Sequence, residues 1–356
     1  MSGGIDSTVT ARLLIEQGYD VVGITMKTWD YATSGGSKKE TGCCTLDSIN
    51  DARQMAVDCG FPHYVIDIRE EFGDYVIDNF VDEYLAGRTP NPCILCNTHI
   101  KWEAMLRRAD AMGCSHIATG HYAKLNFAND RWHVSKARDL TKDQSYVLWG
   151  VSQQCLSRTM FPLGDMLKSE VRTLATEWGY DNLVNKAESY EICFVPDNDY
   201  RGFLKRRVKG LDDQVRGGLF VDKDGNIIGE HEGYPFFTIG QRRGLGVAKG
   251  KPMYVTAIHP ATNTVVLGGA DDLNRNGMTV HNLNWLKYDS IADGMEVTTK
   301  IRYQHPGAAS RLFHDGGNVR VEFDTYVSGI APGQSAVFYE GDDVVGGGNI
   351  MDSFNV

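Results

Sequence analysis

The sequence predicts an α/β domain built on a parallel sheet, followed by a small central β-rich domain and a C-terminal β-barrel. The first observation is length, because 356 residues exceed what one ordinary domain contains. The second is that short apolar runs alternate with helical patterns up to about residue 200, as in parallel sheets covered by helices. The third is that glycine becomes frequent and helical periodicity fades after about residue 210.

The N-terminal part alternates predicted helices and strands. Asp6 and Ser7 open a helical pattern that continues to Gln17, and the apolar run 20–26, DVVGITM, suits a buried parallel strand. Further helices are expected over 47–59, from near Glu70, from near Asn97 and over 168–178, and further strands over 63–68 and 115–120. A sheet of this kind binds its ligands at the carboxyl ends of the strands.

The C-terminal part reads as short strands joined by turns. The segment 221–229, VDKDGNIIG, has a Lys-Asp-Gly-Asn turn between two short strands. Other strand-like runs cover 253–259, 264–269, 296–303, 319–323 and 335–340. We therefore expect domains over 1–200, 201–275 and 276–356, and the strand pattern of the last is typical of a closed barrel or a sandwich.

Composition excludes several classes of protein. No stretch of 18 apolar residues is present, and the start MSGGIDS has no basic region before an apolar run, so neither a membrane span nor a secretory signal is expected. We expect a cytoplasmic protein, in which 8 cysteines are not a disulfide framework. The net charge of −10 argues against a general nucleic-acid coat. The stretch 201–251 nevertheless holds 11 Lys or Arg against 6 Asp or Glu, so this acidic chain is expected to carry a local basic face.

The segment 2–7, Ser-Gly-Gly-Ile-Asp-Ser, is a candidate phosphate-binding loop. Two glycines let backbone amides approach a phosphate, and the helix that follows points its N-terminal dipole at that phosphate. It is not the lysine-containing phosphate loop, because no G-K-[ST] follows. The carboxylate of Asp6 suits magnesium or the positioning of pyrophosphate.

Two further segments carry cysteines with reactive potential. In 89–97, TPNPCILCN, two prolines fix the backbone before a helix expected near Asn97, and a thiol at a helix N-terminus has a lowered pKa. In 189–194, SYEICF, Cys193 lies on a predicted loop after the 168–178 helix. Cys96 and Cys193 are 97 residues apart, so only the fold can bring them together.

These motifs together resemble the bacterial tRNA-specific 2-thiouridylases, a family of ATP pyrophosphatases with a pyrophosphate loop and an adenine-nucleotide hydrolase-like, Rossmann-like N-terminal domain. Besides SGGIDS, TPNPCILCN and EICF, the matching segments span almost the whole chain in the family's order. They are GITMKTWD at 23–30, GCC at 42–44, ATGHYA at 118–123, LTKDQSYVLW at 140–149, PLG at 162–164, FTIGQRRGLG at 237–246, KIRYQH at 300–305 and APGQSAVFY at 331–339.

The resemblance implies an enzyme that replaces the C2 oxygen of uridine 34 with sulfur in tRNAs for lysine, glutamate and glutamine. ATP, with Mg²⁺, would adenylate that oxygen, and a cysteine desulfurase or sulfur-carrier protein would supply sulfur. By position, Cys193 would carry the persulfide and Cys96 would be the nucleophile that frees the sulfur or closes a transient Cys96–Cys193 disulfide. The enzyme is expected to act as a monomer, without a membrane and without a metal site built from its own side chains.

The same resemblance assigns ligand contacts residue by residue. Its ATP-contacting positions correspond to Met1, Ser2, Gly3, Gly4, Ile5, Asp6, Ser7, Met26 and Gly120. Its target-base segment corresponds to Asn91, Pro92 and Cys93, and its tRNA contacts correspond to His121, Lys142, Asp143, Gln144, Arg302, Tyr303 and Gln334. Chemistry on a wobble base requires that base to be splayed out of its stack, where side chains read its edges.

Two departures from the family pattern affect this interpretation. Many members place Asp where this chain has Cys93, so Cys93 is either an auxiliary thiol or one of three ligands, with Cys96 and Cys193, of an iron–sulfur cluster. The persulfide route is favoured over the cluster. The fold also needs a hydrophobic strand ahead of the loop, and the chain begins at Met1, so we expect the natural protein to be longer.

Two other functions remain open at this point. Another pyrophosphate-loop ligase or amidotransferase would need no paired thiols. A non-catalytic tRNA-binding factor would bind RNA without cleaving ATP.

Overall fold

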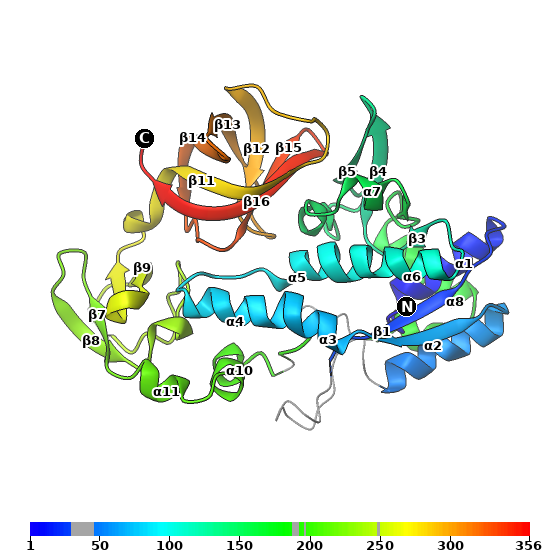
Figure 1. The fold of residues 1–356 in the computed structure, drawn as a ribbon, viewed down its shortest axis with the longest axis horizontal. Coiled ribbons are helices and arrows are strands. Elements are labelled where there is room, and N and C mark those ends of the chain that lie inside the picture. Colours follow the sequence, from blue (N-terminus) through cyan, green and yellow to red (C-terminus); the bar gives the residue numbers. More distant parts are fainter. Residues whose placement is uncertain (30–45, 187–191, 196, 248–249) are drawn as a thin grey trace. The chain divides into compact units, whose positions relative to one another are not determined.

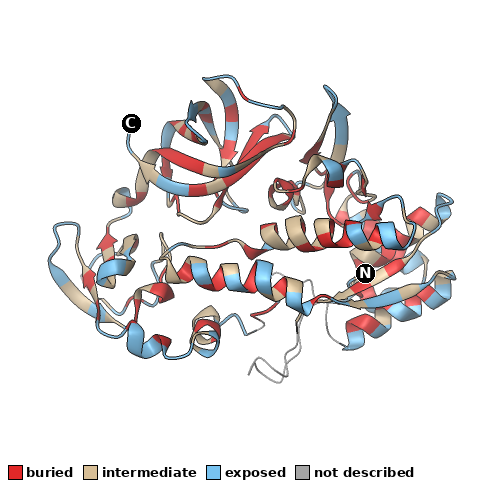
Figure 2. Ribbon diagram, viewed as in Figure 1, coloured by how far each residue is buried: buried red, intermediate tan, exposed pale blue. Residues whose placement is uncertain are grey.

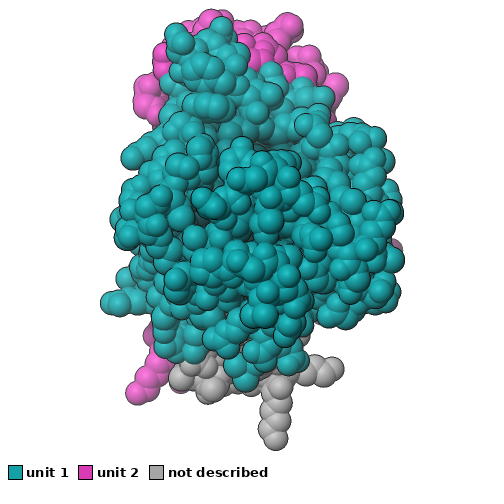
Figure 3. Space-filling model, turned by 90° about the vertical axis from the view of Figure 1, so that its right-hand side faces the viewer, with its two compact units in different colours: residues 1–76, 93–199, 342–344 teal, residues 77–92, 200–341, 345–356 magenta. Residues whose placement is uncertain are grey.

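The computed structural model describes residues 1–29, 46–186, 192–195, 197–247 and 250–356. It divides into two compact units, which Figure 3 colours separately. Unit 1 comprises Met1–Val76, Cys93–Asp199 and Asp342–Val344, and unit 2 comprises Ile77–Pro92, Tyr200–Gly341 and Val345–Val356. Cys43, Cys44 and the segment Ser189–Glu191 lie outside the described residues.

Unit 1 contains the predicted parallel strands and their helices (Figure 1). Strand β1 (Gly23–Lys27) pairs in parallel with β2 (His63–Asp67), and β3 (Ile117–Ala118) pairs in parallel with β6 (Thr159–Met160). Helices α1 (Ile5–Glu16), α2 (Leu46–Cys59) and α8 (Lys168–Glu177) form where periodicity predicts them. The predicted α/β character of the N-terminal part is therefore confirmed.

A buried cluster fixes α1 against α8 behind the candidate phosphate loop. Val9 of α1 and Val171 of α8 are fully buried, and Tyr122 and Leu163 pack in the same cluster. Apolar residues recur on one face of each helix, so burial of that face holds both helices in place. The N-terminal ends of α1 and α8 are therefore held in place by a packed core.

The helices around Cys96 differ from the sequence-based expectation. A helix expected near Asn97 begins at Pro92, where proline suits the first turn because its missing N–H would have no partner there. Helix α5 (Pro92–Leu95) leads into the π-helical segment η2 (Cys96–Ala104) and then α6 (Met105–Ala111). The helix expected near Glu70 consists of α3 (Arg69–Phe72), the π-helical η1 (Gly73–Ile77) and α4 (Asp78–Leu85).

An antiparallel hairpin interrupts the α/β pattern of unit 1 and was not predicted. Strands β4 (Ala123–Ala128) and β5 (Arg131–Lys136) are joined by Asn129 and Asp130, both with positive φ, as a tight two-residue turn requires. Ser135 of β5 pairs with Asp343, so the hairpin takes its last partner from near the end of the chain.

Shorter helices complete unit 1. They are the 3₁₀ helix η3 (Ser145–Leu148), α7 (Gln153–Leu156) and α9 (Asp181–Val184).

The central part of unit 2 is a four-stranded sheet with the order β8-β7-β10-β9. Its strands are β7 (Gly218–Val221), β8 (Ile227–His231), β9 (Tyr254–His259) and β10 (Thr264–Gly268). Phe236 and Phe237 are buried in the core of this part and are not exposed as a stacking platform. Short helices flank it: α10 (Tyr200–Arg207), α11 (Leu211–Gln214) and the 3₁₀ turns η4 (Tyr234–Phe236), η5 (Pro260–Thr262) and η6 (Asp271–Leu273).

The predicted C-terminal barrel is confirmed. Its strands are β11 (Asn274–Trp285), β12 (Met295–Lys300), β13 (Ala308–Asp315), β14 (Asn318–Ser328), β15 (Ser335–Glu340) and β16 (Asp343–Phe354). They follow the order β11-β14-β13-β12-β15-β16, and β11 also pairs with β16, which closes the barrel. Buried residues line its interior (Figure 2), and closure leaves no unpaired edge.

None of the helices in these ranges combines the length and the apolar character needed to cross a bilayer.

Candidate active site

The candidate phosphate loop is shaped by two glycines with different surroundings. Gly3 has φ of +64°, and a Cβ there would lie 2.1 Å from the main-chain oxygen of Ser48 on α2. Gly4 forms the N-cap of α1 without a side-chain cap, and a Cβ on it would meet only Ser2 Oγ, at 3.4 Å. Gly3 is thus required for close packing, whereas Gly4 leaves room beside the N–H groups that begin α1. This arrangement fits a phosphate group.

Asp6 stands in the first turn of α1 and is held by two side chains from distant segments. Lys168 Nζ lies 2.7 Å and 2.8 Å from its two carboxylate oxygens, and the Tyr122 hydroxyl donates to Oδ1 at 2.7 Å. A Cβ at Gly120 would come within 2.9 Å of the main-chain carbon of Asp6. The close approach of the loop therefore requires a glycine at position 120.

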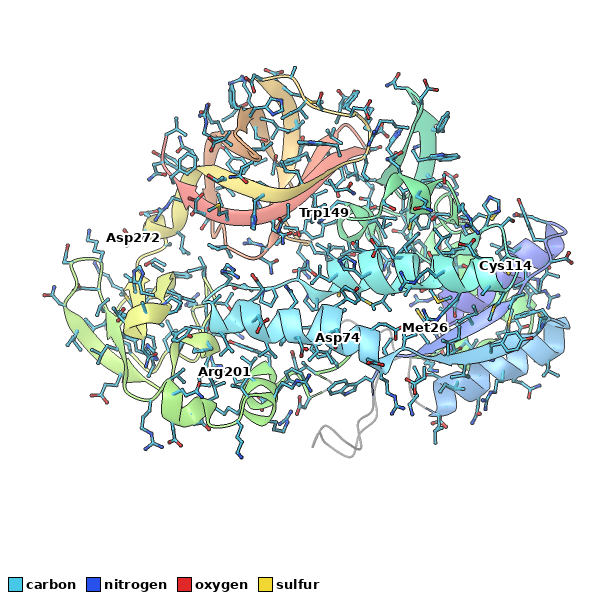
Figure 4. The ribbon with its side chains drawn as sticks, in the orientation of Figure 1. Met26, Asp74, Cys114, Trp149, Arg201 and Asp272 are labelled. Carbon is cyan, nitrogen blue, oxygen red and sulfur yellow. The ribbon has the colours of Figure 1, made fainter. Side chains whose placement is uncertain are left out.

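The first residues of the chain lie against β1. The terminal ammonium of Met1 donates to the carbonyl of Ile24, and the carbonyl of Met1 accepts from Thr25 Oγ1 at 2.8 Å. Met26, labelled in Figure 4, lies near the carboxyl end of β1 opposite Ile66. The predicted ATP-contacting positions Met1–Ser7, Met26 and Gly120 thus come together at one region of unit 1.

Lys186 joins the loop to α2. Its ammonium donates to the carbonyl of Gly3 at 3.0 Å, to Ser48 Oγ at 3.2 Å and to Asp51 Oδ2 at 2.9 Å. Three acceptors match the three protons of the ammonium group. Lys186 precedes Cys193 by seven residues in the sequence.

Cys93 and Cys96 lie one helical turn apart on α5 and η2. Cys93 keeps an exposed surface, yet it sits among enough protein atoms that desolvation raises the pKa of its thiol, with Lys101 opposing the shift. The expectation of a lowered thiol pKa at this helix start is wrong for Cys93, because loss of water outweighs the favourable effect of a four-residue helix. Cys96 is partly exposed.

Cys193 is exposed and is followed by a buried anchor. Phe194 is 2% exposed, and its ring centroid lies 5.8 Å from that of Phe72 and 6.3 Å from that of Trp29. Burial of Phe194 therefore fixes the backbone beside a cysteine that remains open to solvent. No disulfide joins any of the six described cysteines. No group of three His, Cys, Asp or Glu side chains among the described residues could hold a metal ion.

The predicted tRNA contacts of unit 1 form a connected segment. Gln144 Oε1 accepts from the Tyr122 N–H at 3.0 Å, and the Gln144 N–H donates to the Tyr122 carbonyl at 2.8 Å. Asp143 accepts from the N–H of Ala137 at 3.1 Å and from Ser145 Oγ at 2.8 Å, so its carboxylate organises the turn. Lys142, in the same turn, is partly exposed.

His121 precedes Tyr122 and is 8% exposed. Its Nδ1 lies 2.9 Å from Thr119 Oγ1. Burial, and secondarily Lys101, hold the pKa of His121 well below its usual value, so the ring is neutral at physiological pH.

The predicted tRNA contacts of unit 2 differ in their environment. Gln334 Nε2 donates to the carbonyls of Thr89 at 3.0 Å and of Pro90 at 3.1 Å, directly before Asn91 and Pro92. Both N–H groups of that amide are thereby used, which leaves Oε1 for other partners. Arg302 and Tyr303 are exposed in the connection between β12 and β13.

The basic stretch on α10 is paired within unit 2. Lys205 bonds to Asp212 and Glu232, and Arg207 bonds to Asp78 at 2.8 Å.

Sequence reasoning missed three side chains of this site, namely Lys168, Tyr122 and Lys186. A lysine at the first position of an amphipathic helix, directly after an apolar segment, is a detectable signal for Lys168, whose side chain is 7% exposed. Tyr122 lies within the quoted motif ATGHYA, but nothing local shows that its hydroxyl reaches Asp6. Lys186 acts through contacts to residues more than 130 positions away, which a pattern cannot reveal.

Comparison with known proteins places this geometry in a family. Residues 1–197 match the family described as a tRNA methyl transferase HUP domain, 201–269 match the tRNA methyl transferase PRC-barrel domain, and 275–350 match the aminomethyltransferase β-barrel domain. The HUP description agrees with the nucleotide-hydrolase-like fold expected for the N-terminal part.

Proteins that are similar to this chain over nearly its whole length are not named methyl transferases. A protein of Amoebophilus asiaticus is 63% identical over 99% of this chain and 94% of its own, and one of Cytophaga hutchinsonii is 62% identical over 99% and 96%. One of Salinibacter ruber is 55% identical over 99% and 93%. All three are named tRNA-specific 2-thiouridylase MnmA. With this identity over nearly its whole length, and with the HUP, PRC-barrel and β-barrel domains in one chain, the protein belongs to the tRNA-specific 2-thiouridylase family.

Proposed function

We propose that this protein is an ATP-dependent tRNA sulfurtransferase that converts uridine 34 to 2-thiouridine in tRNAs for lysine, glutamate and glutamine. The observation that carries the proposal is the exposed Cys193 in a chain whose full-length relatives are named 2-thiouridylases. The pyrophosphate loop in the same unit supports ATP as the activating substrate. The methyl transferase wording of the domain descriptions is less favoured, because methyl transfer needs neither a pyrophosphate loop nor the cysteines.

Activation of the base is the first step. The C2 oxygen of the uracil attacks the α-phosphorus of ATP, and pyrophosphate leaves. Residues Met1–Ser7, Met26 and Gly120 bind the nucleotide in this proposal, and the N–H groups at the start of α1 face its phosphates. Asp6 has the hard oxygen donors that suit Mg²⁺, which would accompany ATP and neutralise phosphate charge. Lys168 supplies a further positive charge beside Asp6.

Sulfur transfer is the second step. A desulfurase or sulfur carrier leaves an outer sulfur on Cys193 as a persulfide. That sulfur attacks C2 and AMP departs, which leaves the base joined to Cys193 through a disulfide. The Cys96 thiolate then attacks the Cys193 sulfur, and the electron pair of the broken S–S bond forms the C2 thiocarbonyl. A Cys96–Cys193 disulfide remains, and a cellular thiol reduces it.

Recognition of the target base is assigned to Asn91, Pro92 and Cys93. With a raised pKa, the Cys93 thiol stays protonated near neutral pH and serves as an auxiliary donor near the base. The remaining tRNA contacts are assigned to His121, Lys142, Asp143, Gln144, Arg302, Tyr303 and Gln334. Arg302 and Tyr303 are exposed enough to meet a phosphate and a base, respectively.

The iron–sulfur alternative gains no support from the described residues, because no three suitable side chains gather there. Cellular tRNA as substrate favours a cytoplasmic enzyme, and we propose that it works as a monomer.

A thiolation assay tests the function. Unmodified lysine tRNA is incubated with ATP, Mg²⁺, cysteine and a desulfurase, and sulfur is detected by retardation in a mercury-containing gel. We expect activity from aerobic, iron-free enzyme, loss with Cys96→Ala or Cys193→Ala, and survival with Cys93→Ala. Activity confined to anaerobic, iron-loaded enzyme and lost with any of the three variants would establish the cluster route instead. RNA binding without ATP cleavage would identify a non-catalytic factor.

A further inference from the structure

Tyr122 contacts both proposed ligand sites: its side chain contacts the nucleotide site, and its main chain contacts the tRNA-binding turn 142–144. Its hydroxyl donates to Asp6 Oδ1 at 2.7 Å, inside the first turn of α1. Its main chain exchanges two hydrogen bonds with Gln144, at 3.0 Å and 2.8 Å. The side chain is 3% exposed and packs in the cluster between α1 and α8. Such a residue cannot shift at one end without disturbing the other.

A second hydrogen-bonded connection runs in parallel. Lys168 holds both oxygens of Asp6 through its ammonium, and its main-chain N–H donates to Asp139 Oδ2 at 2.9 Å. Asp139 Oδ1 in turn accepts from the N–H of Thr141 at 3.1 Å and from its hydroxyl at 2.6 Å. Thr141 directly precedes Lys142, so both connections from Asp6 end in the same turn.

We propose that Tyr122 is a positioning residue that couples occupation of the segment 142–144 by RNA to the orientation of Asp6 at the pyrophosphate loop. The inference rests on the proposed function and deepens it: besides supplying the attacking oxygen, bound tRNA orients Asp6 for the cleavage of ATP. RNA held by Lys142 and Gln144 restrains the Tyr122 backbone, and the hydroxyl restrains the carboxylate. The hydrogen bonds between Tyr122 and Gln144 are the structural link through which binding of tRNA affects the nucleotide site.

Tyr122→Phe removes the hydroxyl and keeps the ring, so the buried cluster survives. Asp6 keeps Lys168 as its partner. Tyr180→Phe is the matched control, because that hydroxyl lies 3.4 Å from Cys59 Sγ, in the same unit but outside both connections. Pyrophosphate release is measured with and without saturating unmodified lysine tRNA, and thiolation is measured in the same samples.

We expect Tyr122→Phe to lower the stimulation by tRNA, the ratio of the two rates, about tenfold, the usual scale for a lost hydrogen bond to a charged group. The Michaelis constant for tRNA should change little while the stimulated turnover falls. Tyr180→Phe should keep the wild-type ratio. Gln144→Met should lower the ratio at saturating RNA, and the double variant should lose no more than the worse single variant.

Several results would overturn the inference. Equal loss of both rates would make Tyr122 a residue of the nucleotide site alone, and full additivity of the two substitutions would separate Tyr122 from Gln144. Wild-type enzyme that thiolates tRNA but cleaves ATP equally fast without RNA removes the coupling and leaves the proposed function intact. Wild-type enzyme that thiolates no tRNA contradicts the proposed function itself. If Tyr122→Phe unfolds, the ratio in Gln144→Met decides alone.

Discussion

Lys168 Nζ and the two carboxylate oxygens of Asp6 form a bidentate ion pair, at 2.7 Å and 2.8 Å, between the N-terminal turns of two packed helices. The lysine side chain is 7% exposed and the aspartate 33%. In the proposed reaction this pair places a cation, Lys168, beside Asp6 of the loop 2–7, which contains no Lys or Arg of its own.

Substitution Lys168→Met should impair both stability and ATP cleavage. It leaves Asp6 with the Tyr122 hydroxyl alone, and partial exposure of the carboxylate limits the loss in unfolding free energy to about 2 kcal/mol. Urea unfolding and pyrophosphate release measure the two effects. Lys124→Met is the control, because Lys124 pairs with an exposed Asp165 and should cost under about 1 kcal/mol. Unchanged pyrophosphate release in folded Lys168→Met would remove Lys168 from the site.

Substitution Gly3→Ala should disrupt the loop. The new Cβ meets the Ser48 carbonyl oxygen at 2.1 Å and the residue has φ of +64°, so we expect a loss of roughly 3 kcal/mol or more. Gly18→Ala is the matched control, because Gly18 has φ of +86° with nothing within 4 Å and should cost about 1 kcal/mol. Thermal melting compares the two. Equal melting temperatures would show that α2 yields to the side chain.

Substitution Gln334→Glu should slow sulfur transfer without changing the affinity for ATP. The carboxylate keeps the size of the amide but donates nothing to Thr89 and Pro90, so the backbone ahead of Asn91 loses its restraint. We expect thiolation turnover to fall about tenfold while ATP affinity stays at the wild-type value. Equilibrium ATP binding and single-turnover thiolation test this. Gln154→Glu, at an exposed position of α7 that the proposal assigns to no ligand, serves as the control. A fall in ATP affinity would contradict the assignment.

Substitution Lys186→Met should slow sulfur transfer. It removes three hydrogen bonds that the Lys186 ammonium makes to Gly3, Ser48 and Asp51, seven positions before Cys193 in the sequence. We expect slower closure of the Cys96–Cys193 disulfide after persulfide loading, measured by thiol alkylation and mass spectrometry. Lys186→Arg should restore part of the rate. Wild-type disulfide kinetics in Lys186→Met would show that this anchor has no role.

Acidification should destabilise the central sheet through His231. Burial lowers the pKa of His231 to about 4, whereas the unfolded chain titrates near 6.5. The folded state therefore favours the neutral ring. The contribution of His231 to the free energy of unfolding is fully present above about pH 6.5 and is lost as the pH falls toward 4. Between pH 7 and 5 the loss should be about 2 kcal/mol. Urea unfolding at both pH values measures it, and His231→Asn should flatten the dependence. An equal slope in both proteins would assign the effect to other groups.

Much of the fold could be predicted from the sequence because its signals are local. Apolar periodicity over 6–17 and 168–178 and short strands in the C-terminal part each predict an element that forms. The β4–β5 hairpin was missed because Asn129-Asp130 is a weak turn signal inside an α/β pattern. The helix start at Pro92 was missed because proline was interpreted as a constraint on the preceding loop.

The residues of the candidate site likewise fall into those that the sequence indicates and those that only the fold brings together. Gly3, Gly4, Asp6 and the cysteines occur in motifs, so sequence alone indicates them. The ion pair of Asp6 with Lys168 joins residues 162 positions apart, and such contacts exist only after folding. The raised pKa of Cys93 likewise depends on protein packed around it, which outweighs its helix position.

The strand β16 has a consequence for how the chain is made on the ribosome. Asp342 and Asp343 complete unit 1 by bonding to Lys136 and Ser135, at 2.9 Å and 2.5 Å, and the residues that follow close the barrel against β11. Synthesis proceeds from the N-terminus, so residues 342–354 emerge after β5 and β11, with which they pair. Until then the β5 edge and the barrel seam are open to chaperones or to other nascent chains. A message truncated before the codons for residues 342–354 would therefore leave both units unfinished, even with every proposed catalytic residue translated.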